Sequence, residues 1–350
     1  MPDVNVVVTL GLQQELVERV KAVDPRLRVT VLSPAQRRLF RGGHSPWPGY
    51  REAAADTEES EEQARGALHT TLAEAEVLFT LSLMPADLPS LAPHLRWLQL
   101  TSAGADRLLD SEVLKSGITI TTASGIHAAP VGEYAVGMMV MLAKGWPGLF
   151  RAQARREWAR ITPQELEGST VAVVGMGNVG QEIARLAKAL NMRVLGVRRS
   201  GASLESGDYV ADEIVAPLEL LSVLSRSDFV VVCLPLTEET HHLIGELALR
   251  SMKPTAYLIN VSRGAVVDEA ALLRALTEGW IAGAGLDVFE TEPLPEKSWL
   301  WQLNNVIITP HLAGETPIYN ERAVDLFCEN LRRYLAGEPL HNVVDPSRGY

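Results

Sequence analysis

The chain has 350 residues, of which 47% are hydrophobic and 21% are charged, and its formal net charge is -11 at pH 7. At the usual ~100 to 200 residues per domain, this length predicts about two domains with substantial cores. The acidic balance argues against nucleic acid or an anionic membrane surface as the main partner, because both bind clustered cations. No metal site is expected either, since the adjacent His241 and His242 do not place two ligands on one helix face.

The cysteine content and the apolar stretches indicate in which cellular compartment the protein is expected. Only Cys233 and Cys328 are present, so we expect no disulfide framework and a reducing, cytoplasmic location. Residues 5–10 resemble a first strand and not a signal peptide. The most apolar long stretch, residues 134–143, is too short to span a bilayer and predicts a buried helix.

The first part of the chain alternates strand-like and helix-like segments. Apolar runs bounded by turn residues predict strands at residues 5–9, 27–32, 76–80 and 96–100, and a helical period predicts a helix at residues 13–23. Such alternation is typical of βα units on a parallel sheet.

Four further segments lie outside these strands. The Gly- and Pro-rich residues 41–50 predict a surface loop, and the charged residues 58–65 predict a solvent-exposed helix. Residues 130–144 and 151–160 both have a helical period, and Pro130 suits a first helical turn.

A second βα series begins after Gly168. The expected elements are strands 170–174, 193–197, 228–234, 256–260, 281–286 and 306–308, a helix 178–190 after the first of these strands, and a last helix 318–335 that ends at Gly337. The sequence therefore predicts an α/β fold of two Rossmann-like or flavodoxin-like parallel-sheet domains.

A glycine motif opens the second series. Gly175, Gly177 and Gly180, with Asn178 and Val179 between the last two, follow an apolar strand and begin a helix. The first glycine permits a tight turn, the second lets a pyrophosphate approach the backbone, and the third lets helix and strand pack closely. The helix N-terminus adds free amides and a positive dipole. This motif predicts dinucleotide binding.

The next strand indicates which dinucleotide is bound. An NAD site usually carries an Asp or Glu about 20 residues on, for the ribose hydroxyls. This strand ends instead in Arg198, Arg199 and Ser200, which suit a 2′-phosphate. We therefore expect NADP(H), with NAD(H) as the weaker alternative; the other interpretation is that both arginines simply point to solvent.

Arg263, Glu292 and His311 each follow one of the last three predicted strands. In open α/β sheets, ligand chemistry gathers beyond the carboxyl ends of such strands. A guanidinium suits a carboxylate, an imidazole can carry a proton near neutrality, and a carboxylate can keep that imidazole charged. Singly, such residues are more often structural hydrogen-bonding groups, but together, after a dinucleotide turn, they suit the reduction of a 2-keto acid.

Five ordered strings, GMGNVG, CLPLTEETHHLI, NVSRGAVVDEAAL, GAGLDVFETEPLP and NVIITPHLAG, resemble the D-isomer-specific 2-hydroxyacid dehydrogenase family. The resemblance covers residues 99–335. It implies a substrate domain made of residues 1–103 and 311–350, with a dinucleotide-binding domain, residues 104–310, inserted and the active site in the cleft between the two. It also implies a homodimer to which residues 130–160 contribute.

The same resemblance implies catalytic roles. Arg263 would bind the carboxylate and keto oxygen of the substrate. Glu292 and His311 would form the acid–base pair, with Glu292 holding the imidazole charged and oriented. The residue matching Asp287 would hold the nicotinamide amide.

The resemblance also implies binding residues. Backbone amides of the loop Ser102, Ala103 and Gly104 would cradle the substrate carboxylate, beside Arg263 and His311. The expected cofactor-binding residues are Gly175, Gly177, Asn178, Val179, Gly180, Arg198, Arg199, Ser200, Pro235, Val261, Ser262, Asp287 and Gly314.

These observations favour an NADP(H)-dependent oxidoreductase of a small 2-keto or D-2-hydroxy acid, with glyoxylate or hydroxypyruvate as first substrates. Formate or phosphite oxidation on the same scaffold is one alternative, although Glu292 argues against the formate enzymes, which carry an amide there. A dinucleotide-sensing co-repressor that binds protein partners is the other, since such relatives can keep Arg263, Glu292 and His311.

Overall fold

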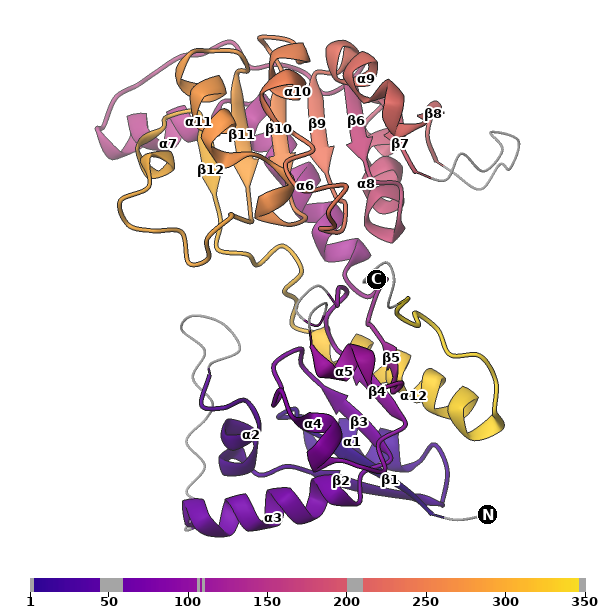
Figure 1. Cartoon of the computed structure of the whole chain (residues 1–350). Coiled ribbons are helices and arrows are strands. Elements are labelled where there is room, and N and C mark those ends of the chain that lie inside the picture. Colours follow the sequence, from indigo (N-terminus) through magenta and orange to yellow (C-terminus); the bar gives the residue numbers. More distant parts are fainter. Residues whose placement is uncertain (1–2, 45–58, 106–107, 109–110, 200–209, 346–350) are drawn as a thin grey trace. The chain divides into compact units, whose positions relative to one another are not determined.

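The computed structural model describes residues 3–44, 59–105, 108, 111–199 and 210–345. The chain folds into two compact units (Figure 1): unit 1 consists of Met1–Ile126 and Thr316–Tyr350, and unit 2 of His127–Glu315. Each unit holds one sheet of parallel strands, five in unit 1 and seven in unit 2. The expected fold class, two parallel-sheet α/β domains, is confirmed.

The two units divide the chain later than the boundaries expected at 103/104 and 310/311. Unit 1 extends to Ile126 and resumes at Thr316. The reason is the short strand Thr119–Thr121, which pairs in parallel with Trp97–Leu100 and so keeps this part of the chain in the first sheet. This strand, Thr-Ile-Thr, contains a single apolar residue, so it gives too weak an apolar signal to be found from sequence.

Unit 1 is a sheet of order β2-β1-β3-β4-β5. Its strands are β1 Val4–Val8, β2 Leu27–Val31, β3 Val77–Thr80, β4 Trp97–Leu100 and β5 Thr119–Thr121. Its helices are α1 Gln14–Lys21, α2 Pro34–Phe40, α3 Glu61–Ala73, α4 Leu88–Leu91, α5 Glu112–Lys115 and α12 Tyr319–Ala336.

Side chains of β1 alternate between the two faces of this sheet. Val6 and Val8 pack in a cluster with residues of α1 and α12, whereas Val7 packs in another with residues of α3. Phe327 of α12 stacks on Phe79 of β3, with ring centroids 4.3 Å apart. Helices cover both faces of this sheet, so β1, β3 and β4 are mostly apolar and buried, which is why the sequence located these three strands closely.

Unit 2 is a sheet of order β12-β11-β10-β9-β6-β7-β8. Its strands are β6 Thr170–Val174, β7 Arg193–Val197, β8 Glu213–Val215, β9 Phe229–Val232, β10 Tyr257–Asn260, β11 Gly283–Leu286 and β12 Val306–Ile308. Its helices are α6 Ala128–Ala143, α7 Trp146–Ala154, α8 Asn178–Ala189, α9 Leu220–Arg226, α10 Glu246–Ser251 and α11 Glu269–Thr277, with the 3₁₀ turns η2 Pro217–Glu219, η3 Gly264–Val266 and η4 Trp299–Gln302.

The chain of unit 2 starts in the middle of its sheet and winds outward in both directions (Figure 1). Val171 and Val173 of β6 pack with residues of α6 and α8, and Ala172 and Val174 pack with residues of α9, α10 and α11. The order of the strands reverses between β6 and β9, so the carboxyl ends of these two strands form a topological switch point, where such sheets bind ligands.

The predicted helices are confirmed with one correction. The segment expected at 130–144 is α6, and the one expected at 318–335 is α12, which ends at Gly337 in the left-handed conformation. The segment expected to be helical at 151–160 is helical only to Ala154. Beyond it, Arg156 has a φ of 57° and the residues to 160 are exposed, so no buried face sustains the helix.

In the stretch around α2 and α3, the loop expected at 41–50 is described only to residue 44. The helix expected at 58–65 begins at Glu61, after the N-cap Ser60, and continues to Ala73. Residues 45–58 lie outside the described residues. None of the described helices is both long and apolar enough to cross a membrane, and Cys233 and Cys328 are free thiols.

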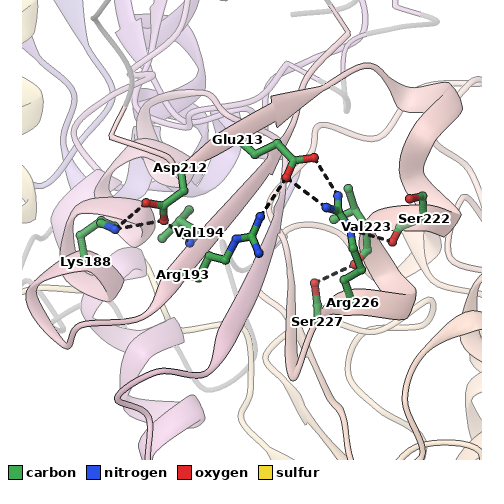
Figure 2. A network of polar contacts seen from close by, with 9 residues as sticks. All are labelled: Lys188, Arg193, Val194, Asp212, Glu213, Ser222, Val223, Arg226 and Ser227. Carbon is green, nitrogen blue, oxygen red and sulfur yellow. Dashed lines mark hydrogen bonds and ion pairs between the residues drawn. The ribbon is translucent and has the colours of Figure 1, made fainter.

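A network of ion pairs holds β8 at the edge of the sheet of unit 2 (Figure 2). Asp212 accepts hydrogen bonds from Lys188 Nζ (2.8 Å) and from the backbone N–H of Val194 (2.7 Å). Glu213 lies 2.8 Å from Arg226 and 3.3 Å from Arg193. Hydrogen bonds from Lys188 and Arg226 lower the pKa of Asp212 and of Glu213 respectively.

Candidate active site

The glycine turn after β6 is built as its sequence predicts. Gly175 has a φ of 113°, and a Cβ there would lie 2.7 Å from the backbone oxygen of Cys233. A Cβ at Gly180 would lie 1.9 Å from the oxygen of Gly175, so only glycine permits this approach of α8 to the turn. A Cβ at Gly177 would meet no described atom within 4 Å. The turn therefore leaves open space at the N-terminus of α8, and this fits a pyrophosphate.

Cys233 supports this turn from β9. Its Sγ donates to the backbone oxygen of Gly175 at 3.0 Å, and burial raises the pKa of its thiol to about 12. The group is therefore a neutral thiol and a weak donor. Pro235, an expected cofactor residue, follows in an exposed loop; its cofactor contact stays a prediction.

The tip of β7 carries the arginines expected to select the cofactor. Arg198 continues the strand pairing, since its N–H donates to Val215 at 3.0 Å. Arg199 is exposed, and its Nη1 lies 2.8 Å from Glu239 Oε2. Ser200 lies outside the described residues. Sequence reasoning missed this contact because Glu239 lies 40 residues from Arg199 in the chain.

Asn260 builds the turn that carries Arg263 at the end of β10. Its Oδ1 accepts from the N–H (3.1 Å) and Oγ (2.8 Å) of Ser262, and its Nδ2 donates to the backbone oxygen of Arg263 at 3.1 Å. Arg263 Nη1 donates to the oxygen of Ser262 at 2.8 Å. The expected cofactor residues Val261 and Ser262 lie within this turn. The turn fixes the backbone position from which the Arg263 side chain extends.

Asp287, at the end of β11, fixes the segment that carries His311. It is 1% exposed, and its carboxylate accepts from Thr309 Oγ1 (2.6 Å) and from the N–H groups of Leu312 (3.0 Å) and Ala313 (2.9 Å). Its backbone oxygen accepts from the N–H of His311 at 2.8 Å. These contacts support a role in placing His311; the expected contact with nicotinamide stays a prediction.

Glu292 and His311 form a close pair. Glu292 Oε2 lies 2.7 Å from His311 Nδ1, and Oε1 accepts from the N–H of Phe289 at 3.1 Å. Burial acts to raise the pKa of Glu292, but the hydrogen bond and charge of His311, the Phe289 amide and the charge of Arg263 outweigh it and lower that pKa. With Nδ1 bonded to Glu292, Nε2 is the ring atom left to exchange a proton with a substrate.

The structure brings Arg263, Glu292 and His311 together in unit 2, because their strands β10, β11 and β12 are neighbours in the sheet. Gly314, another expected cofactor residue, lies near His127, whose Cδ2 would be 3.0 Å from a Cβ at that glycine.

The expected substrate loop belongs to unit 1, where it follows β4. Ser102 Oγ donates to the oxygen of Gly104 at 2.8 Å, and the oxygen of Ser102 accepts from Ala123 at 2.8 Å. Ala103 lies between them. These bonds show a defined loop, and its role with substrate stays a prediction.

Comparison with curated proteins gives close relatives. The glyoxylate reductase of Korarchaeum cryptofilum is 39% identical over 264 residues, which cover 73% of this chain and 77% of that protein. The glyoxylate reductase of Pyrococcus furiosus is 38% identical, with 71% and 75% covered.

Comparison with solved structures gives similar folds. The D-isomer specific 2-hydroxyacid dehydrogenase from Xanthobacter autotrophicus, in complex with NADPH and MES, has a TM-score of 0.79 at 30% identity, with 99% of this chain and 100% of that chain covered. The NADPH-dependent glyoxylate/hydroxypyruvate reductase from Sinorhizobium meliloti, in complex with NADP and sulfate, has a TM-score of 0.76 at 26% identity and the same coverage.

A doubly wound sheet with this glycine turn and this histidine–carboxylate pair defines the class of the protein, a dinucleotide-dependent oxidoreductase. Residues 136–313 match the family model described as D-isomer specific 2-hydroxyacid dehydrogenase, NAD binding domain. The chain belongs to the D-isomer specific 2-hydroxyacid dehydrogenase family, and the resemblance seen in its motifs is confirmed.

Proposed function

We propose that the protein reduces a small 2-keto acid, glyoxylate or hydroxypyruvate, to the D-2-hydroxy acid with NADP(H) as the preferred cofactor and NAD(H) as the weaker one. The observation that carries this proposal is the 2.7 Å contact between His311 Nδ1 and Glu292 Oε2, in a site that also holds Arg263. The glyoxylate reductases among its relatives support the choice of substrate.

Each residue of the trio has a separate task in this reaction. A nicotinamide cofactor bound at the glycine turn would supply the hydride for the keto carbon. His311, charged and oriented by Glu292, donates a proton from Nε2 to the oxygen that is becoming an alkoxide. Arg263 orients the carboxylate of the substrate by charge-assisted hydrogen bonds and polarises the keto group.

The expected cofactor is supported by two features of unit 2. The open turn at Gly177 and the N-terminus of α8 fit the pyrophosphate. Arg198 and Arg199 provide guanidinium groups at the tip of β7, where a 2′-phosphate would lie. Structural relatives solved with NADPH or NADP are consistent with this choice.

A steady-state assay tests the proposal. Consumption of NADPH and of NADH would be followed with glyoxylate, hydroxypyruvate and pyruvate. Reduction of NADP⁺ and of NAD⁺ would be followed with formate and phosphite. We expect turnover with a 2-keto acid and a higher kcat/KM with NADPH. Turnover of formate or phosphite alone, or tight NADPH binding without turnover of any substrate, would overturn the activity, and a clear NADH preference would overturn the cofactor assignment.

His311→Ala gives the decisive variant. We expect its kcat to fall on the order of 100-fold or more, since general acid catalysis contributes about that much, while NADPH still binds.

Arg263→Ala should instead raise KM for the keto acid and lower kcat together. Near-normal activity in either variant would refute the role of that residue.

We also propose a homodimer in a reducing, cytoplasmic compartment. Exposed aromatic side chains in the segment expected at the dimer interface support the assembly: Trp158 is 96% exposed and Phe150 is 53% exposed. Light scattering coupled to size exclusion tests it, and a monomer at micromolar concentration would contradict it.

A further inference from the structure

Three segments of unit 2 meet beside the proposed acid–base pair. Residues 242–244 follow the loop after β9, residues 264–269 lead from η3 into α11, and residues 289–292 follow β11. The backbone N–H of His242 donates to Ala265 at 2.8 Å, that of Ile244 to Val266 at 3.1 Å, and that of Asp268 to Ile244 at 3.2 Å. The first two segments are therefore joined by their main chains.

Glu290 joins the third segment to the other two. Its Oε1 lies 2.8 Å from His242 Nε2 and accepts from the N–H of Glu269 at 3.1 Å. Its own N–H donates to Glu269 Oε2 at 3.3 Å. Glu290 is thus the point at which all three segments are held.

The main chains of the second and third segments are in direct contact. A Cβ at Gly264 would lie 1.8 Å from the backbone carbon of Phe289, so only glycine fits there. Arg263 immediately precedes this contact, and Glu292 follows it by three residues. A displacement of one segment against the other would therefore change the spacing between Arg263 and Glu292.

A short path leads from this junction to the reacting histidine. Phe289, next to Glu290, donates its N–H to Glu292 Oε1 at 3.1 Å, and Glu292 Oε2 holds His311. Glu290 is therefore linked to His311 through the neighbouring Phe289 amide and the carboxylate of Glu292.

Several polar atoms of the junction already have partners within the chain. Side-chain atoms of His242, Asp268 and Glu290 lie within 4.8 Å of one another, a spacing that could hold a metal ion. However, Asp268 Oδ1 caps α11 through the N–H of Ala271 (2.9 Å), and Glu290 Oε1 accepts two bonds. Burial and the nearby Glu290 raise the pKa of Glu269, so two carboxyl groups lie close together at this junction beside the imidazole of His242.

We propose that His242 and Glu290 are positioning residues for the reaction: their contact fixes the 289–292 segment against the Arg263 turn and so holds Glu292 in place to orient His311. Neither residue touches substrate or cofactor in this role. The inference rests on the proposed function, because it assigns a purpose to the pair within that reaction.

The backbone at His242 permits a clean deletion. Its φ is 52°, a left-handed conformation that glycine adopts without strain. His242→Gly therefore removes the imidazole without disturbing the turn. We expect kcat for the keto acid to fall on the order of tenfold, with the Kd for NADPH unchanged, since the glycine turn that binds it follows a different strand.

Variants at Glu290 separate hydrogen bonding from charge. Glu290→Ala should match His242→Gly, because both lose the contact. Glu290→Gln keeps an acceptor oxygen for the N–H of Glu269 and for His242, so it should retain most of the activity. His241→Ala is the matched control, because its ring only stacks on that of His242 and no role is given to it; its activity should equal that of the wild type.

A spectroscopic readout makes the test independent of turnover. The Nδ1–H of His311, held by Glu292, should give a downfield proton resonance that is absent in His311→Ala. We expect His242→Gly and Glu290→Ala to broaden or lose this resonance while Tm changes little. An unchanged resonance together with unchanged kcat in both variants would overturn the proposal, as would equal losses in His241→Ala. If the wild type turns over no keto acid, the proposed function fails, and the resonance alone still decides whether the junction positions His311.

Discussion

At the scale of single residues, charges carry most of the chemistry of this site. The sequence indicates Arg263, Glu292 and His311 because their types and their places after strands suit one reaction. It does not reveal Asn260, which builds the Arg263 turn, or Glu239, which pairs with Arg199 at 2.8 Å. Both act through contacts that only the folded chain creates, so no local pattern announces them.

Glu292→Gln tests the charge of the acid–base pair. The pKa of Glu292 is lowered, so this carboxylate stays ionised down to below the ordinary Glu range near ~4.3 and favours a protonated His311. In the amide variant, which lacks the negative charge beside the imidazole, the pH at which reductive activity falls should move down. Measuring kcat/KM between pH 5 and 9 checks this, and an unmoved profile would mean that another group holds His311.

Glu239→Gln tests cofactor choice. Its carboxylate faces Arg199 on the surface, with side chains 70% and 53% exposed, and would repel a 2′-phosphate bound to that guanidinium. Removing the charge should raise the affinity for NADPH roughly two- to fivefold, the range of a surface ion pair, and leave NADH nearly unaffected. Fluorescence titration measures both. Glu238→Gln, at the exposed neighbour, is the control, and weaker NADPH binding in Glu239→Gln alone would contradict the sign.

At the scale of helices and strands, burial determines how accurately the sequence predicts the bounds of an element. Strands covered on both faces, such as β6 and β10, are apolar runs and were located almost to the residue. β5 (Thr-Ile-Thr) and β8 (Glu-Ile-Val) are short and partly polar, so they leave little trace in the sequence, whereas the equally short but wholly apolar β12 was found. Missing β5 also displaced the expected domain boundary. The prediction of a helix over residues 151–160 was wrong beyond Ala154. Its helical period is present in the sequence, but residues 155–160 are exposed, so no packing stabilises a helix there.

The ion pairs of β8 give a prediction at this scale. The pKa of Asp212 is lowered in the folded protein, so its stabilisation is present above the unfolded carboxyl range and is lost as pH falls through the lowered value. Asp212→Asn should reduce the free energy of unfolding by about 1 kcal/mol at pH 7, and this deficit should shrink as pH falls below about 4. Urea unfolding of both proteins at several pH values checks it. A deficit that does not change with pH would assign the effect to packing, and the exposed Glu296→Gln serves as control.

At the scale of the whole molecule, the chain leaves unit 1, builds unit 2 and returns to complete unit 1 with α12. The returning helix belongs to the first core: Phe327 is fully buried between Phe79 and Trp97, whose ring centroids lie 4.3 and 5.3 Å away. The stability of unit 1 therefore depends on residues that are synthesised after unit 2.

Phe327→Ala tests this dependence. Deleting a buried Phe typically lowers the free energy of unfolding by ~3 to 5 kcal/mol, and here the loss should fall on unit 1. Hydrogen exchange of the backbone amides of β3 and β4 should report an earlier transition, while NADPH binding by unit 2 persists at low temperature. Phe150→Ala, at a side chain 53% exposed, should leave the transition in place. Simultaneous loss of NADPH binding would show that the two units unfold as one.

The order of the chain through the two units has a practical consequence for dissecting the protein. Because unit 2 is one uninterrupted stretch of polypeptide, His127–Glu315, it can be excised as a single gene fragment, whereas unit 1 can be obtained alone only by splicing its two pieces together. The glycine turn and the trio Arg263, Glu292 and His311 all lie on that single stretch. A fragment of residues 127–315 would therefore carry the glycine turn and the trio but not the Ser102 loop.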